Sequence, residues 1–274
     1  MRTFDELNLG KSLWNAIEEA GFQHPTPIQT EAFSKIRSGQ DIVGIAQTGT
    51  GKTLAYLMPL LRDFVFSKDN FAKVLILVPT RELVIQVVEE AKVLSKYLTV
   101  RVKGVYGGAN INTQKLELLE GVDIVVGTPG RVMDLGLDGI IKMNMIKKLV
   151  IDEVDEMLNL GFRTQLKNLI ELLPEKRQNL MFSATLTEEV ESMIHDFFVN
   201  PLKIEVAIHG TPLDQIQQLA YHVPNYYTKT NLLLHLLKEE ELSKVLVFVS
   251  SKKMADRLFE KLQGELGSDV GVIH

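Results

Sequence analysis

A glycine-rich loop with the sequence AQTGTGKT, at residues 46–53, carries the strongest chemical signal in the chain. Gly49 and Gly51 allow a turn whose backbone amides point inward, so that several N–H donors and a helix N-terminus converge on an anion. Lys52 adds a charge that can reach the outer phosphates of a nucleotide, and the Thr53 hydroxyl can ligate magnesium. The spacing predicts a phosphate-binding loop; the alternative is an ordinary glycine-rich turn.

Two acidic residues, Asp152 and Glu153, directly follow the apolar run at 148–151. If that run is a buried parallel strand, they lie at the same edge of the sheet as the phosphate loop. Asp152 can hold magnesium through water, and Glu153 can polarise an attacking water. The alternative is an ordinary helix start, since Asp and Glu favour first turns.

Two further motifs are weaker on physical grounds alone. The Gln29 amide offers a donor and an acceptor side by side, which matches the N6 and N7 edge of adenine and favours ATP over GTP. A lone Gln on a helix is more often a surface residue. Likewise, Ser183-Ala184-Thr185 follows a strand and can simply cap a helix beginning near Thr187.

Apolar runs alternate with helical patterns, and the elements they predict form a parallel sheet covered on both faces. A helix is expected at 11–20, and a turn at 25–29 is expected to lead into a second helix that runs through Ser38-Gly39. The strands expected next are 42–45, 74–78, 102–106, 122–126, 148–151 and 179–182. The helices expected between and after them are 51–62, 81–97, 111–119, 129–137, 153–173 and 187–198.

A composition shift near residue 207 divides the chain. Residues 1–206 are predicted to form an ATP-binding α/β domain, 207–213 a linker, and 214–274 part of a second α/β domain. In that second part the expected strands are 218–223, 245–249 and 270–274, and the expected helices are 228–238 and 253–263.

Composition narrows the class of protein. The 274 residues are 45% hydrophobic and 24% charged, enough for one full domain and part of another. The chain has no Cys, which excludes disulfides and thiolate metal sites. No targeting segment or apolar run long enough for a membrane span occurs, so a soluble, cytoplasmic setting without membrane contact is expected. The net charge of −5 argues against nucleic-acid binding by bulk electrostatics alone.

The ordered motifs resemble those of the DEAD-box ATP-dependent RNA helicases over nearly the whole chain. That family usually has Ala at the first position of the phosphate loop, as Ala46 here. Residues 152–155 resemble its acid box, and residues 25–29 resemble its adenine-sensing Q motif. The resemblance implies RecA-like domains, ATP and Mg²⁺ as cofactors, RNA as partner, and catalytic roles for Lys52, Asp152 and Glu153.

The resemblance also assigns residues to ligands. The nucleotide-binding residues it implies are Phe4, Phe22, Thr26, Gln29, Ala46, Gln47, Thr48, Gly49, Thr50, Gly51, Lys52 and Thr53. Thr53 and Asp152 hold the metal. The RNA-contacting residues it implies are Pro79, Thr80, Arg81, Gly107, Gly108, Thr128, Pro129, Gly130 and Arg131. The residues that couple hydrolysis to strand separation are Asp155, Ser183 and Thr185.

The RNA assignments have a physical rationale. Hydroxyls and amides at helix starts can donate to phosphate oxygens, while Arg81 and Arg131 supply charge. The paired glycines let an RNA strand approach the backbone closely. No aromatic stacking platform is evident, which suits a sequence-independent grip on the sugar-phosphate backbone. For each Arg the alternative is a surface salt bridge.

Two departures from the family pattern bear on function. Val154 stands where the family has Ala, and we expect it to face neighbouring packing with the acid roles unchanged. The chain also ends at His274 before the family's terminal arginine-rich motif, whose Arg residues act as fingers on the γ-phosphate. We therefore expect the first RecA-like domain and the start of the second, with little activity alone.

Other classes of function stay open on the sequence. The chain can be a DNA-directed or protein-remodelling ATPase of related fold. It can also be a binding or assembly module, in which the edge of an unfinished second sheet pairs with another copy to form a homodimer.

Overall fold

The computed structural model describes residues 3–206, 217–238 and 242–273. Its contacts divide the chain into two units, Met1–His209 and Gly210–His274. The division falls inside the linker predicted at 207–213, which lies outside the described residues.

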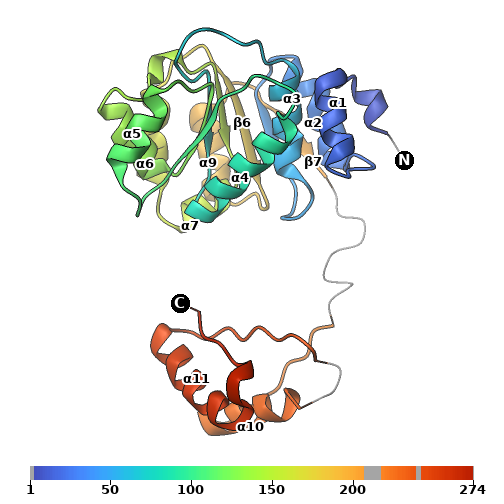
Figure 1. Ribbon diagram of the computed structural model, residues 1–274, viewed down its shortest axis with the longest axis vertical. Coiled ribbons are helices and arrows are strands. Elements are labelled where there is room, and N and C mark those ends of the chain that lie inside the picture. The colour runs from blue at the N-terminus through green and yellow to red at the C-terminus, as the bar shows by residue number, and fades with distance from the viewer. Residues whose placement is uncertain (1–2, 207–216, 239–241, 274) are drawn as a thin grey trace. The chain divides into compact units, whose positions relative to one another are not determined.

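Seven parallel strands form the sheet of the first unit, in the order β3-β4-β2-β5-β6-β1-β7 (Figure 1). They are β1 (Ile42–Ile45), β2 (Val74–Leu77), β3 (Val102–Val105), β4 (Ile124–Gly127), β5 (Lys148–Ile151), β6 (Gln178–Ser183) and β7 (Leu202–Glu205). The first six lie close to their predicted positions. β7 was not predicted, because this edge strand alternates exposed and covered residues instead of showing a continuous apolar run.

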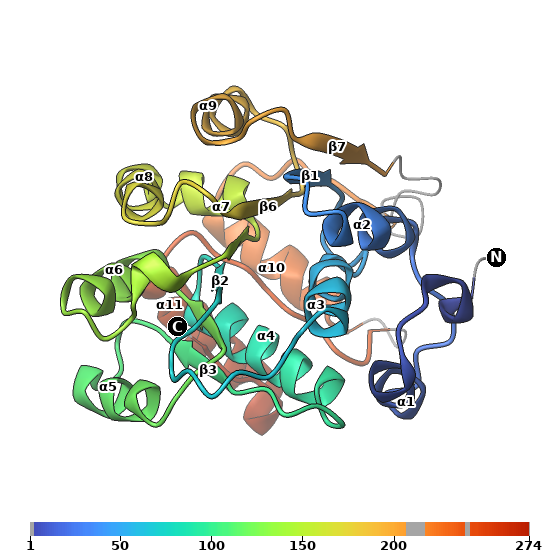
Figure 2. The same ribbon diagram turned by 90° about the horizontal axis from the view of Figure 1, so that it is seen from above.

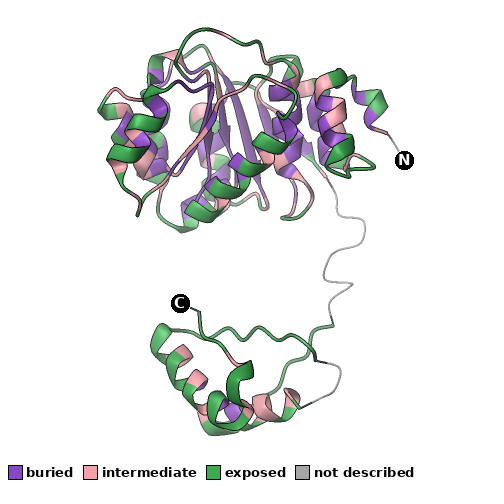
Figure 3. Cartoon of the chain, viewed as in Figure 1, coloured by how far each residue is buried: buried purple, intermediate pink, exposed green. Residues whose placement is uncertain are grey.

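Helices cover both faces of this sheet, as Figure 2 shows from above. One core packs under α1 (Lys11–Glu19), α2 (Pro27–Arg37), α3 (Lys52–Arg62) and α4 (Arg81–Leu94), with the short η1 (Phe4–Leu7). The other packs under α5 (Ile111–Leu119), α6 (Pro129–Leu137), α7 (Val154–Asn159), α8 (Arg163–Glu171) and α9 (Glu188–Phe197), with η2 (Met143–Met145). Most strand residues are buried between these two layers (Figure 3). This arrangement confirms the predicted RecA-like α/β fold.

The prediction of a single helix at 153–173 is wrong, because two helices, α7 and α8, occupy that span. Gly161 has φ 81°, in the left-handed region. The Gly161 N–H donates to the Leu158 carbonyl at 2.9 Å, and the Phe162 N–H donates to the Met157 carbonyl at 3.0 Å. This pair of bonds is a Schellman motif, which ends α7 and redirects the chain.

The described part of the second unit contains helices α10 (Tyr226–Leu236) and α11 (Lys252–Leu266), followed by η4 (Gly267–Asp269). The strands predicted at 218–223 and 245–249 are wrong, and residues 270–273 form no strand either; His274 lies outside the described residues. At 245–249 every side chain is exposed, from 38 to 86%. Apolar content favours a strand, but a strand needs a neighbour for its backbone hydrogen bonds, and no segment among the described residues pairs with this one.

Within residues 3–206, 217–238 and 242–273, no helix has both the length and the apolar character that crossing a membrane requires.

Candidate active site

The strand order sorts the sequence motifs into two groups along the carboxyl edge of the sheet. β6 lies between β1 and β5, so the phosphate loop, the acid box and Ser183 lie side by side. The strands β3, β4 and β2 stand at the other end of the strand order, and their carboxyl ends carry the glycine pair, Thr128 and Thr80. The edge therefore has a β5-β6-β1 half and a β3-β4-β2 half.

The phosphate loop adopts the conformation that its glycines permit. Gly49 and Gly51 both have φ 84°, where an L side chain would be strained. The Thr50 hydroxyl donates to the Gln47 carbonyl at 2.7 Å and closes the turn. The Ala46 N–H donates to the Ser183 carbonyl at 3.0 Å, which fixes the start of the loop to β6.

Lys52 begins α3 and is 6% exposed, yet its buried Nζ has no hydrogen-bond partner among the described residues. An ammonium with no partner is costly to bury, so the site is built for an anion that is not part of the protein. The helix N-terminus supplies further donors at the same place. These residues fit a nucleotide phosphate.

Asp152 follows β5 and is 5% exposed. Burial raises the pKa of its carboxyl to about 6, against the opposing effect of the Lys52 charge. Its Oδ1 accepts from the Glu153 N–H at 2.9 Å. A buried carboxylate near Lys52, at the same edge of the sheet as Thr53, suits Mg²⁺ held jointly with phosphate and water.

Glu153 is the only described residue other than Gly and Asn with positive φ, at 53°. Asn tolerates this region, whereas for Glu it is strained, and such strain gathers at functional sites. Burial raises the pKa of Glu153, and the nearby Asp155 raises it further, while Lys52 lowers it. A carboxylate with a raised pKa beside a phosphate site can accept a proton from water.

The structure brings the three predicted coupling residues together. Asp155 Oδ2 accepts from the Thr185 hydroxyl at 2.8 Å and from the Thr185 N–H at 3.0 Å. Ser183, fully buried, donates from its hydroxyl to the Thr185 carbonyl at 2.7 Å. The acid box and the loop after β6 are thus one hydrogen-bonded unit. Val154 faces packing, as expected, because it is 0% exposed in the core under α5 to α9.

Gln29 is 4% exposed and already bonded within the protein. Its Oε1 accepts from the Thr26 N–H at 3.0 Å, and its Nε2 donates to the Gly51 carbonyl at 3.2 Å. Each atom keeps one further bonding position for a base. Gln29 therefore also ties α2 to the phosphate loop, a role that the sequence did not reveal.

The two predicted aromatic contacts to nucleotide differ in exposure. Phe22 is 43% exposed, next to the glycine that ends α1. Phe4 is 1% exposed and belongs to the core under α1 to α4. Phe22 can meet a ligand, whereas Phe4 contributes through packing.

On the β3-β4-β2 half, Thr80 caps α4 by accepting from the Leu83 N–H at 3.3 Å. Arg81 is exposed, and its guanidinium lies over the Tyr106 ring, 5.0 Å from the centroid. Gly108 has φ 76°, and added Cβ atoms at Gly107 or Gly108 would meet nothing. The glycine pair is open to an approaching chain.

Arg131 is held by the protein itself. Its Nη1 donates to Gln114 Oε1 at 2.8 Å and its Nη2 to the Ala109 carbonyl at 3.1 Å. Its side chain is 10% exposed. The guanidinium fixes α6 against α5 and the glycine loop, so it supports this surface more than it projects from it.

The remaining residues predicted to contact RNA divide into buried residues and partly exposed ones. Pro79 and Pro129 are buried, and Pro129 occupies the first turn of α6, where its fixed φ suits the helix. Thr128 and Gly130 are partly exposed, and Thr128 makes no side-chain cap bond. The prolines shape the backbone, while Thr128 keeps its hydroxyl for another partner.

Sequence reasoning missed Tyr56, Tyr106 and Gln114. Tyr106 and Gln114 orient the two arginines. Tyr56 lies in an apolar helix pattern, so no periodic signal separates it from ordinary core.

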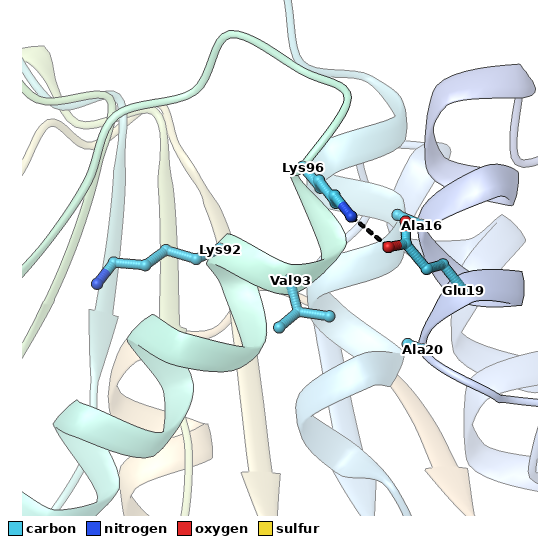
Figure 4. A pocket seen from close by; sticks show the side chains of 6 residues that line it. All are labelled: Ala16, Glu19, Ala20, Lys92, Val93 and Lys96. Atoms are coloured by element: carbon cyan, nitrogen blue, oxygen red, sulfur yellow. Dashed lines mark hydrogen bonds and ion pairs between the residues drawn. The ribbon is translucent and has the colours of Figure 1, made fainter.

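A hollow of about 350 Å³ between α1 and α4 is lined by Ala16, Glu19, Ala20, Lys92, Val93 and Lys96 (Figure 4). A Lys96–Glu19 ion pair crosses it. Lys92 lies about 16 Å along α4 from Arg81, at a rise of about 1.5 Å per residue. The hollow therefore lies toward the opposite end of α4 from the carboxyl edge and contains none of the predicted site residues.

Comparison with known proteins gives a consistent result. Residues 26–193 match the model of the DEAD/DEAH box helicase family. The chain is 38% identical over 272 residues to the RNA helicase CrhR of Synechocystis sp., covering 99% of this chain and 55% of that protein. It is 36% identical over 278 residues to the ATP-dependent RNA helicase RhlB of Shewanella oneidensis, covering 98% and 63%. The chain thus spans little more than half the length of these relatives, and it belongs to the DEAD/DEAH box helicase family.

Proposed function

We propose that this chain binds ATP with Mg²⁺ at the β5-β6-β1 half of the sheet edge and RNA at the β3-β4-β2 half. In the whole protein, hydrolysis of ATP would drive local separation of RNA strands. The observation that supports the nucleotide site most strongly is the buried Lys52 amine, which has no partner in the described residues. A buried ammonium group without a partner favours the binding of an anion next to it.

The roles of the residues follow from their positions. Lys52 and the loop amides bind the β- and γ-phosphates, and Thr53 and Asp152 hold the metal. Mg²⁺ would neutralise charge that develops on the phosphates. Glu153 orients the attacking water and accepts its proton. Asp155 carries any shift of the acid box to Thr185, with which it shares two hydrogen bonds.

RNA would lie across the starts of α4 and α6. Thr80, Thr128 and nearby amides donate to phosphate oxygens, and Arg81 supplies charge from an exposed position. Contacts of this type read no base, so the grip is independent of sequence. The relatives RhlB and CrhR are named as RNA helicases, which favours RNA over DNA.

Nucleotide binding tests the first part of the proposal. We expect a fluorescent ATP analogue to bind with Mg²⁺, and GTP to compete weakly. Gln29→Ala should weaken the binding of ATP and reduce the preference for ATP over GTP. Equal affinity for ATP and GTP in the wild type, or an unchanged preference in Gln29→Ala, would reject the adenine contact.

RNA binding tests the second part. With a non-hydrolysable ATP analogue present, single-stranded RNA should outcompete DNA of the same sequence. DNA binding as tightly would favour a DNA-directed ATPase, and binding of neither would favour a protein-remodelling one.

A further inference from the structure

Tyr56 is a buried polar residue to which the proposed function gives no role. It lies in α3, one turn after Thr53, and is 0% exposed. Its ring packs on Phe182 with centroids 5.4 Å apart. Its hydroxyl is buried and makes no hydrogen bond of ordinary length and angle in the described structure.

The strand geometry places this hydroxyl at the metal site. Val150 and Phe182 both belong to the core under α1 to α4, as Tyr56 does. Because side chains alternate along a strand, Asp152 points to the same face as Val150. Ile151 pairs with Met181, so Asp152 and Phe182 are the next residues on their strands. Tyr56, whose ring packs against Phe182 at a tilt of 48°, therefore lies beside Asp152.

Gly44 makes this arrangement possible. It pairs with Phe182, and a Cβ at Gly44 would come within 2.7 Å of the Phe182 ring. Without that Cβ, the Phe182 ring lies across β1 and supports the Tyr56 ring.

Packing alone does not account for the hydroxyl. A phenylalanine would fill the same apolar place without a buried unpaired O–H group, which costs free energy. Burial, and then the nearby Asp152 carboxylate, raise the pKa of Tyr56 well above its usual range. A tyrosine phenol carries its proton at neutral pH, so it can donate a hydrogen bond to a neighbouring carboxylate.

We propose that Tyr56 is a positioning residue for Mg²⁺, which donates a hydrogen bond to one Asp152 oxygen when nucleotide and metal bind, so that the other oxygen faces the metal hydrate. Outer groups that orient a ligating carboxylate are a general feature of metal sites. The inference rests on the proposed function, because it needs Mg²⁺ and nucleotide to occupy this site.

The test is a Mg²⁺ titration of a fluorescent, non-hydrolysable ATP analogue bound to the full 274-residue chain. Tyr56→Phe should raise the Mg²⁺ concentration at half-saturation about tenfold. Analogue affinity in EDTA should stay unchanged, and the Tm should not fall. Tyr97→Phe is the matched control, since it also removes a phenol hydroxyl, one that donates to Glu19 on the surface.

Tyr56→Leu separates the hydroxyl from the ring. It should shift the Mg²⁺ midpoint as far as Tyr56→Phe while also lowering the Tm, because it loses packing on Phe182. A Tyr56→Phe midpoint within about twofold of a Mg²⁺-dependent wild type would overturn the inference. A wild type that binds the analogue without any Mg²⁺ dependence contradicts the proposed metal site itself, and the inference with it.

Discussion

The two halves of the sheet edge satisfy their polar groups in opposite ways. In the β5-β6-β1 half, the Lys52 amine and the Tyr56 hydroxyl are buried and make no ordinary hydrogen bond within the described residues, and Asp152 is desolvated. In the β3-β4-β2 half, Arg131 is bonded to Gln114 and Ala109, and Arg81 rests over Tyr106.

This difference separates two kinds of binding surface. A pocket with unmet hydrogen-bonding capacity gains most from a compact, highly charged ligand that completes it. A surface whose cations are already oriented by their own neighbours needs no rearrangement and suits a long polymer bound through many weak contacts. Four substitutions, two in each half, test whether the halves differ in this way.

Lys52→Ala should have the largest effect on binding. Loss of a charge-assisted contact to phosphate lowers affinity for an ATP analogue by about 100-fold. The Tm should not fall, because the variant also removes an unpaired buried ammonium. Calorimetric titration and thermal unfolding measure the two quantities, and Lys92→Ala, which removes an exposed Lys paired with Glu89, is the control. A large loss of stability in Lys52→Ala would mean that the amine has a structural partner.

Asp152→Asn should stabilise the protein in the absence of metal. The raised pKa means that the folded state holds a proton more tightly than the unfolded state, so the wild type loses stability as pH rises from about 4 through about 6. The difference between the pKa of Asp152 in the folded protein and its usual value corresponds to a loss of roughly 3 kcal/mol of unfolding free energy at pH 7. Denaturant unfolding should therefore show Asp152→Asn more stable than wild type at pH 7 and equal to it near pH 4. Equal stability at both pH values would contradict the desolvated carboxylate.

The smallest effects are expected for the arginines. Arg131→Ala should lower the unfolding free energy by about 1 to 2 kcal/mol, since it removes two hydrogen bonds. Arg81→Ala should leave stability nearly unchanged and lower RNA affinity. The slope of log affinity against log salt concentration should fall in magnitude by about 1. Arg131→Lys serves as a control and should not recover stability, because an ammonium cannot reproduce the forked contact. The reverse pattern, with Arg81 structural, would remove the contrast between the halves.

The strands, loops and helix starts that carry the candidate site in the first unit could be predicted because their sequence patterns are local. Glycines at 49 and 51, a Lys at a helix start, and acids after an apolar run each have a local cause. The division at Gly161 was also present in the sequence, as a glycine within a helical pattern. It was overlooked because the apolar spacing continues through it.

What the sequence did not give depends on tertiary partners. The run at 245–249 has strand composition, but it is exposed and unpaired in the described residues. Arg131 shows no local sign that Gln114 will hold it, and Phe4 shows no sign that it will be buried. Tyr56 becomes informative only when the strand register places it beside Asp152.

The position of β1 has a consequence for folding. β1 is flanked by β6 and β7, the last two strands of the sheet in chain order. The Asp41 side chain accepts from the Asn179 N–H across 138 residues, so this docking closes a long loop, which is slow. The start of the phosphate loop, where the Ala46 N–H donates to the Ser183 carbonyl, has no partner on β6 until that strand arrives. We therefore expect the proposed nucleotide site of a nascent chain to form only as the sheet is completed, and ATP bound there would stabilise the finished domain.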